Sequence, residues 1–258
     1  MNLPEEALIM WKGDFMKKIG KSAELLWIFG ILFVAIGVAL CSKANLGVSM
    51  IAAPTFVIHE AIAPLWDGFS VGVTEYLVQG VVLILLCLAV RRFNWRYLLA
   101  FAVAVIYGYT LNLFLFVFDG IPTDAVWIRF LMLIVGDIFT ALGVACFFHT
   151  YLPLQVHELF VAEFSARYHL SINKVKWAYD LFLLTLSVVL ALTLFGDAST
   201  FDFSRLLTED YHSVGIGTII TTVINSPLIA LWGKGIEKLF DPTPRFEALE
   251  RLLVRKQA

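Results

Sequence analysis

The sequence predicts an all-α polytopic membrane protein with six transmembrane helices, arranged as two inverted three-span repeats. Each repeat is expected to carry a broken or re-entrant helix after its first span. Hydrophobic residues make up 60% of the 258-residue chain, above the share of about 45–50% in soluble domains. Six apolar stretches are each long enough to cross a bilayer core, which takes ~20 residues of helix. Two of these stretches also resemble each other.

The six expected spans account for most of the chain, and their even number places both termini on one side of the membrane. The chain contains 19 Lys and Arg residues, of which 16 fall in the segments on that same side. Basic residues collect in cytoplasmic segments, so we expect a multi-pass protein of the bacterial cytoplasmic (inner) membrane with both termini cytoplasmic. The expected spans are Leu25–Ser42, Val71–Val90, Tyr97–Phe118, Val126–Phe148, Val175–Phe195 and Val214–Gly233.

The first and fourth spans carry the repeat. Residues 28–39 and 134–145 are identical at seven of twelve positions, and Gly30 and Gly37 align with Gly136 and Gly143. Internal repeats are a primary sign of architecture. Because each copy holds three spans, an odd number, the second copy is inverted relative to the first. The expected parts are a cytoplasmic N-terminal segment at 1–24, the first repeat at 25–118, the second, inverted repeat at 126–233, and a cytoplasmic C-terminal tail at 234–258.

Each copy then meets a basic residue and a run that interrupts a helix, at residues 43–49 and 149–155. The connector from Leu46 to Ala63 is too apolar for a solvated loop and too short to span the bilayer. Its counterpart runs from Leu152 to Tyr168. Non-helical backbone at membrane depth is found only where it is buried in protein or lines a water-filled cavity. We therefore expect re-entrant helices here, with a helix lying along the cytoplasmic interface as the alternative for the second.

The two breaks supply the first candidate binding residues. Lys43 and His149 end equivalent spans, and a new helix start follows each of them. The free N–H groups and positive dipole end of a helix start favour an anion. In the first break the binding candidates are Lys43, Asn45 and Ser49, and in the second they are His149 and Gln155. The alternative is that Ser49 caps its helix and Lys43 contacts lipid phosphate.

Polar residues inside the spans supply the remaining candidates, because an intramembrane charge costs about 2.5–3.5 kcal/mol and is functional by default. An interhelical hydrogen bond is the structural alternative for the mid-span Asp137. Glu75, which shares a helix face with Gln79, and Asp180 lie close enough to helix ends to reach the interface instead. The intramembrane residues that we assign to the binding site are Glu75, Asn112, Asp137 and Asn225.

Several other functions are not indicated by the sequence. The motifs H-E-x-x-H and G-x-S-x-G and a phosphate-binding loop do not occur, so we expect no enzyme activity and no cofactor or metal. The three cysteines fit neither a disulfide framework nor a metal site, and they are interpreted as packing residues. Since the basic residues flank the spans, nucleic acid binding is not expected.

Two runs resemble the bacterial YczE/YitT-like integral membrane family. The first is Gly37-Val38-Ala39-Leu40 followed by residues 43–49, and the second is Gly215-Ile216-Gly217-Thr218 ahead of Ser226-Pro227-Leu228-Ile229. The resemblance extends over all six spans and implies a compact six-span bundle without enzyme chemistry. The chain departs from the family pattern at Met50, where Pro is common, and at Leu152-Pro153, where a Gly-rich break is common.

These observations predict a membrane transporter for a small, anionic solute that binds near the midplane between the two repeats. One alternative is a protein that translocates or binds an anionic lipid headgroup. Another is a membrane scaffold or sensor that transports nothing. The expected partners are the lipid bilayer and a small-molecule or lipid-headgroup ligand, and the sequence is compatible with a homo-oligomer.

Overall fold

The computed structural model describes residues 23–66, 68–196 and 210–240. Within these ranges the fold is all-α, as predicted, and consists of eight α-helices and one short 3-10 helix, η1 (Ala63–Leu65). The expected segment 1–24 and the tail after residue 240 lie almost wholly outside the described residues. The helices are α2 (Ala23–Ala44), α3 (Ala53–Ile62), α4 (Val71–Val90), α5 (Tyr97–Phe118), α6 (Val126–Phe148), α7 (Val156–Tyr168), α8 (Ile172–Phe195) and α9 (Ile216–Leu239).

Six of these helices are long and apolar enough to cross a membrane, namely α2, α4, α5, α6, α8 and α9. The predicted bounds of α4, α5 and α6 agree with the structure residue for residue. Helix α4 begins where the Ser70 hydroxyl accepts a hydrogen bond from the Val73 N–H, and it ends at Arg91 in the left-handed conformation. Helix α9 runs six residues past the predicted end because Lys234, Glu237 and Lys238 are good helix formers. The chain is a multi-pass membrane protein.

Helices α2 and α6 form the tightest crossing of the bundle. A Cβ atom at Gly136 would lie 2.7 Å from the Gly37 carbonyl oxygen, and one at Gly143 would lie 2.8 Å from the Gly30 carbonyl oxygen. Contacts this short are possible only for glycine, and small residues are what let membrane helices approach closely. Because the earlier glycine of one helix meets the later glycine of the other, α2 and α6 run antiparallel.

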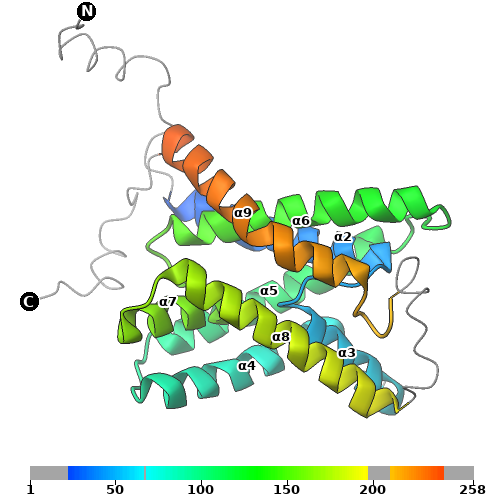
Figure 1. The fold of residues 1–258 in the computed structure, drawn as a ribbon, viewed down its shortest axis with the longest axis horizontal. Coiled ribbons are helices and arrows are strands. Elements are labelled where there is room, and N and C mark those ends of the chain that lie inside the picture. Colours follow the sequence, from blue (N-terminus) through cyan, green and yellow to red (C-terminus); the bar gives the residue numbers. More distant parts are fainter. Residues whose placement is uncertain (1–22, 67, 197–209, 241–258) are drawn as a thin grey trace, which may run out of the picture.

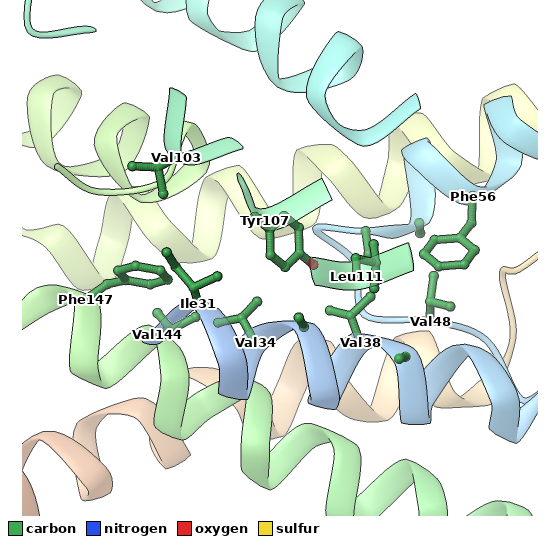
Figure 2. Packing of buried hydrophobic residues seen from close by; sticks show 14 residues of the cluster. Ile31, Val34, Val38, Val48, Phe56, Val103, Tyr107, Leu111, Val144 and Phe147 are labelled. Atoms are coloured by element: carbon green, nitrogen blue, oxygen red, sulfur yellow. The ribbon is translucent and has the colours of Figure 1, made fainter. Parts of the chain in front are cut away.

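Figure 2 shows the apolar core beside this crossing. Tyr107 of α5 is buried and faces Val34 and Val38 of α2, while Val144 and Phe147 of α6 close the cluster. The rest of the lipid-facing surface keeps large apolar side chains exposed, including Leu88, Leu113 and Phe116. An apolar exterior of this kind is expected for spans that contact lipid tails.

The two predicted breaks are present, and a short helix follows each. Residues 45–52 and 149–155 are not helical, and α3 and α7 begin after them. Helix α3 packs on α8, and α7 packs on α4. Figure 1 shows α3 toward the right end of the bundle and α7 toward the left end. Whether either helix enters the bilayer stays a prediction.

The two ends of the bundle can be distinguished by their contacts. Leu26 near the start of α2, Cys146 near the end of α6 and Ile236 near the end of α9 share one buried cluster. The described chain therefore begins and ends at the same end, on the left of Figure 1. Lys43, at the other end of α2, pairs with Asp119 directly after α5.

Candidate functional site

A small polar cavity lies where both breaks meet the spans. It has a volume of about 20 Å³, which exceeds the roughly 10–15 Å³ that one water molecule needs. Apolar walls come from α2, α6 and residues 50–52 of the first break. The polar side chains that line it are Ser49, Glu75, Tyr107, Thr140, Gln155, Glu158 and Asn225.

The breaks explain why polar groups reach this depth. Ser49 belongs to the non-helical run before α3, and its carbonyl oxygen accepts the N–H groups of Ala52 and Ala53. Gln155 is the residue before α7, and Glu158 lies in the first turn of that helix. The starts of both short helices therefore border the same cavity, one from each half of the chain.

Five polar atoms of the cavity lining are buried and have no hydrogen-bond partner among the described residues. Each belongs to a side chain that is at most 5% exposed. Leaving a buried polar group unsatisfied costs about 1–3 kcal/mol, so these free groups mark a place where water or a ligand would gain hydrogen bonds. The five atoms are Ser49 Oγ, Glu75 Oε2, Gln155 Nε2, Glu158 Oε2 and Asn225 Oδ1.

Glu75 is held by its neighbour one helical turn along α4. Gln79 Nε2 donates to Glu75 Oε1 over 2.9 Å, and Gln79 Oε1 accepts the Val156 N–H at the start of α7 over 3.3 Å. Gln79 thus connects the span α4 to the second break. The carboxylate of Glu75 needs a donor and the Val156 N–H needs an acceptor, so these two bonds fix the orientation of the Gln79 amide.

Asp137 and Asn225 connect α6 to α9 behind the cavity. Asn225 Nδ2 donates to Asp137 Oδ1 over 3.0 Å, and both side chains are buried. Asp137 does not line the cavity itself and is connected to it through Asn225. The interhelical hydrogen bond that the sequence allowed for Asp137 is therefore present.

A second polar pocket of about 10 Å³ adjoins the first and shares Ile51 and Glu158 with it. Lys176 and Asp180 lie one turn apart on α8 and form a buried ion pair with a closest N–O distance of 3.0 Å. His157 of α7 also lines this pocket, and its Nδ1 lies 2.7 Å from the Tyr179 hydroxyl. Burial lowers the pKa of His157 to about 3, with a smaller contribution from Lys176. His157 is therefore neutral and accepts or donates as a hydrogen-bonding group.

The structure places Lys43 and His149 outside the cavity and at opposite ends of the bundle. Lys43 Nζ lies 3.1 Å from Asp119 Oδ1. His149 Nδ1 lies 2.7 Å from the Ala145 carbonyl oxygen, and its Nε2 lies 3.4 Å from Glu237 Oε1. Both residues end their helices, and since α2 and α6 run antiparallel, those ends point apart. The two side chains do not share one site, contrary to the interpretation from the sequence.

Asn45 and Asn112 have structural roles as well. Asn45 is exposed and takes a left-handed conformation with φ 51°, which ends the turn after α2. Asn112 of α5 accepts the Gly72 N–H and donates to the Ser70 hydroxyl, both over 2.9 Å. It fixes the start of α4 and does not line the cavity. Of the nine predicted site residues, the cavity brings together Ser49, Glu75, Gln155 and Asn225.

Two residues of this region carried a weaker signal in the sequence. Glu158 is buried in the first turn of α7 and could have been recognised from its place one turn after Gln155. Lys176 was counted among the cytoplasmic basic residues but is buried in α8. Its spacing of four from Asp180 was the signal, because residues at i and i+4 meet on a helix.

Comparison with known proteins is limited to one finding of similarity. Residues 21–234 match the model of a family that is described as a family of unknown function. The match covers all six spans up to the last turns of α9. No curated protein and no solved structure matches the chain.

Proposed function

We propose that this chain, which belongs to DUF6198, a family of unknown function, is a membrane transporter. Its solute binds in the polar cavity between two inverted halves. The observation that carries this proposal is the group of five buried, unpartnered polar atoms around one cavity. The resemblance to YczE/YitT-like proteins, the placement in the bacterial inner membrane with cytoplasmic termini, and the absence of enzyme activity belong to the same proposal.

The contacts between α2 and α6 support the inverted repeat. In the sequence alignment Gly30 corresponds to Gly136, and Gly37 corresponds to Gly143. At the crossing, Gly30 meets Gly143 and Gly37 meets Gly136. Replacing each glycine by its counterpart in the alignment therefore turns one contact into the other. Reciprocal contacts of this kind are expected when a two-fold axis relates the two partners.

The contacts of α3, α4, α7 and α8 are reciprocal in the same way. Helix α3 packs on α8, and its counterpart α7 packs on α4, the counterpart of α8. The pairs Glu75–Gln79 and Lys176–Asp180 occupy equivalent positions, since both members are 101 residues apart, and each pair is bonded within one helical turn. In transporters, inverted repeats place the solute where broken helices meet near the midplane.

A role in transport also gives the two short helices a function. Buried breaks with free polar groups cost stability, and a chain that needed only a stable bundle would be better served by continuous helices. The buried first half of α3 and the buried first turn of α7 favour re-entrant over interfacial helices. We therefore include re-entrant helices in the proposal.

The charge of the solute needs revision from the expectation based on the sequence. An anionic solute was expected because Lys43 and His149 were thought to face the site, and neither lines the cavity. Lys176, which borders the second pocket, is already paired with Asp180. The cavity lining carries Glu75 and Glu158 and contains no cationic side chain.

A lipid-handling protein is the second candidate, favoured by an apolar groove of about 770 Å³ between α4 and α8. Leu85, Phe164 and Leu186 are among its wall residues. Tyr179 lines both this groove and the second polar pocket, so the two regions adjoin. An acyl chain in the groove would bring its headgroup toward Lys174 at the rim or toward Tyr179.

A solute screen on the purified full chain tests the proposal. Solutes that raise the melting temperature would next be assayed for uptake into proteoliposomes. We expect Asn225→Ala and Gln155→Ala to weaken binding by ~10-fold or more, since each removes a hydrogen bond worth about 1.4 kcal/mol or more. Lys43→Gln serves as the matched control and should bind normally. Uptake that these cavity variants leave unchanged would refute the proposed site.

A further inference from the structure

The cavity offers more free acceptors than free donors. Glu75 Oε2, Glu158 Oε2 and Asn225 Oδ1 are acceptors without a partner among the described residues. The oxygen of Asn225 faces away from Asp137 because a carboxylate can only accept, so the amide nitrogen must be the end that pairs with it. A guest that matches this lining therefore brings positive charge or several donors.

The helix starts at the cavity do not reverse this balance. Each N-terminus of a helix acts as roughly half a positive charge, so α3 and α7 together supply about one. Glu158 in the first turn of α7 and the Gln79 oxygen at the Val156 N–H already interact with the second helix start. Burial without a partner favours the neutral form of a carboxyl group, so Glu75 and Glu158 are both ionised only when a cation is bound, and about one negative charge is then left for that cation. A single monovalent cation neutralises it.

The size of the cavity limits the guest further. A volume of about 20 Å³ holds one water-sized particle. A dehydrated alkali-metal ion or an ammonium ion fits this space, whereas a quaternary ammonium ion such as choline does not. Protein oxygens can replace the hydration shell of a monovalent cation in the same way as the carbonyls of a channel filter.

We propose that the cavity binds one small, dehydrated monovalent cation, either an alkali-metal ion or ammonium, through the free oxygens of Glu75, Glu158 and Asn225. The Ser49 hydroxyl, which also lines the cavity and has no partner among the described residues, adds a fourth oxygen. The inference rests on the proposed function: the cation is either the transported solute or the ion that accompanies it.

The test is a cation titration of the purified full chain in lipid nanodiscs. NaCl, KCl and NH₄Cl are each varied against choline chloride at constant ionic strength and constant pH while the melting temperature is measured. We expect a saturable rise with at least one of the three cations and none with choline. Equilibrium binding of ²²Na⁺ or ⁸⁶Rb⁺ should show one ion per chain for the preferred alkali-metal ion.

Variants of the two carboxylates connect the binding to this cavity. Glu75→Gln and Glu158→Gln should each weaken cation binding by ~10-fold or more, as expected when one charged ligand is lost. Asp119→Asn, at the exposed ion pair with Lys43, is the matched control and should leave the affinity unchanged. If the melting temperature of the wild-type chain depends on pH but not on the cation, or responds equally to choline, the inference is wrong. This outcome does not depend on whether the variants fold.

Failure of this inference can be distinguished from failure of the proposed function. A solute that binds and is taken up equally in choline, sodium, potassium and ammonium buffers would remove the cation site and leave the transporter intact. Saturable binding of one cation, without uptake of that cation or of any stabilising solute, would keep the site and end the transport proposal.

Discussion

The backbones of Gly37 in α2 and Gly136 in α6 lie so close together that neither residue could carry a side chain. A Cβ atom at Gly37 would lie 2.5 Å from the Gly136 carbonyl oxygen, and one at Gly136 would lie 2.7 Å from the Gly37 carbonyl oxygen. Because these contacts are with backbone atoms, no change of side-chain rotamer could make room for a Cβ atom. The two helices can therefore approach this closely only while both positions are glycine.

Replacing Gly37 by Ala should force the helices apart and lower the free energy of unfolding by ~1–3 kcal/mol, the usual cost of overpacking. Gly235→Ala in α9 is the matched control, because a Cβ there meets nothing within 4 Å and Ala favours a helix over Gly. Melting temperatures of the two variants in the same detergent give the comparison. Equal values would show that the crossing is looser than described.

The ion pair between Lys176 and Asp180 provides a second prediction. Lys176→Met leaves a buried carboxylate without its partner, so we expect a loss of about 3–5 kcal/mol in the free energy of unfolding. The double variant Lys176→Met/Asp180→Leu should recover part of that loss because no unpaired charge remains. Lys43→Met breaks a pair whose Asp119 side chain is 83% exposed and should cost about 0–1 kcal/mol. A double variant as unstable as the single one would contradict this account.

Asp210, outside the membrane-spanning helices, should make stability depend on pH. Burial, with a smaller contribution from Glu60, raises the pKa of its carboxyl from 3.8 to about 6, although a backbone hydrogen bond, His212 and Arg129 act in the opposite direction. The folded chain then keeps a proton that the unfolded chain releases near pH 4. The stability gained this way is fully present below about pH 3.8 and is lost as the pH rises through about 6.

Asp210→Asn removes this titration. Relative to the variant, the wild-type chain should therefore lose stability between about pH 4 and pH 7. Melting temperatures of both chains across that range give the measurement. Curves that stay parallel throughout would show that Asp210 does not titrate in this way.

Much of the fold could be predicted from the sequence because lipid imposes a simple rule on it. A span must satisfy its own backbone hydrogen bonds over a fixed thickness, so apolar length alone located α4, α5 and α6 to the residue. The short helices α3 and α7 lie within the predicted connectors, 46–63 and 152–168, but where each helix begins was not predicted. An apolar window does not detect a helix start that is marked by polar side chains such as Glu158.

The candidate site was predicted in part for a different reason. Ser49, Gln155, Glu75 and Asn225 were identified as breaks or as intramembrane polar residues, and all four line the cavity. Lys43 and His149 were misplaced because α2 and α6 run antiparallel, so the ends of these two helices lie at opposite ends of the bundle. Residues near the crossing of the two helices meet, whereas residues at their ends do not. The sequence supplied the similarity of the two helices but not the place where they cross.

Orientation in the membrane can be tested with reporters. Without the buried Lys176, 15 basic residues lie on the expected cytoplasmic side and 3 on the other. This split predicts that a reporter fused after Ala258 is cytoplasmic and that one inserted between residues 197 and 212 is external. Activity of an alkaline phosphatase and of a fluorescent protein at each site gives the side. Exchanged signals would reverse the proposed direction of the two halves.

Transport as proposed above requires the cavity to open to both faces of the membrane, on the α3 side and on the α7 side. In a background without Cys41, Cys87 and Cys146, cysteines replacing Ser49 or Gln155 are exposed to an impermeant thiol reagent in right-side-out and inverted vesicles. The account predicts that Ser49→Cys reacts from the external face and Gln155→Cys from the cytoplasmic face, and that a transported solute slows both reactions. Labelling of both positions from one face alone would contradict it, because the cavity would then be a one-sided pocket.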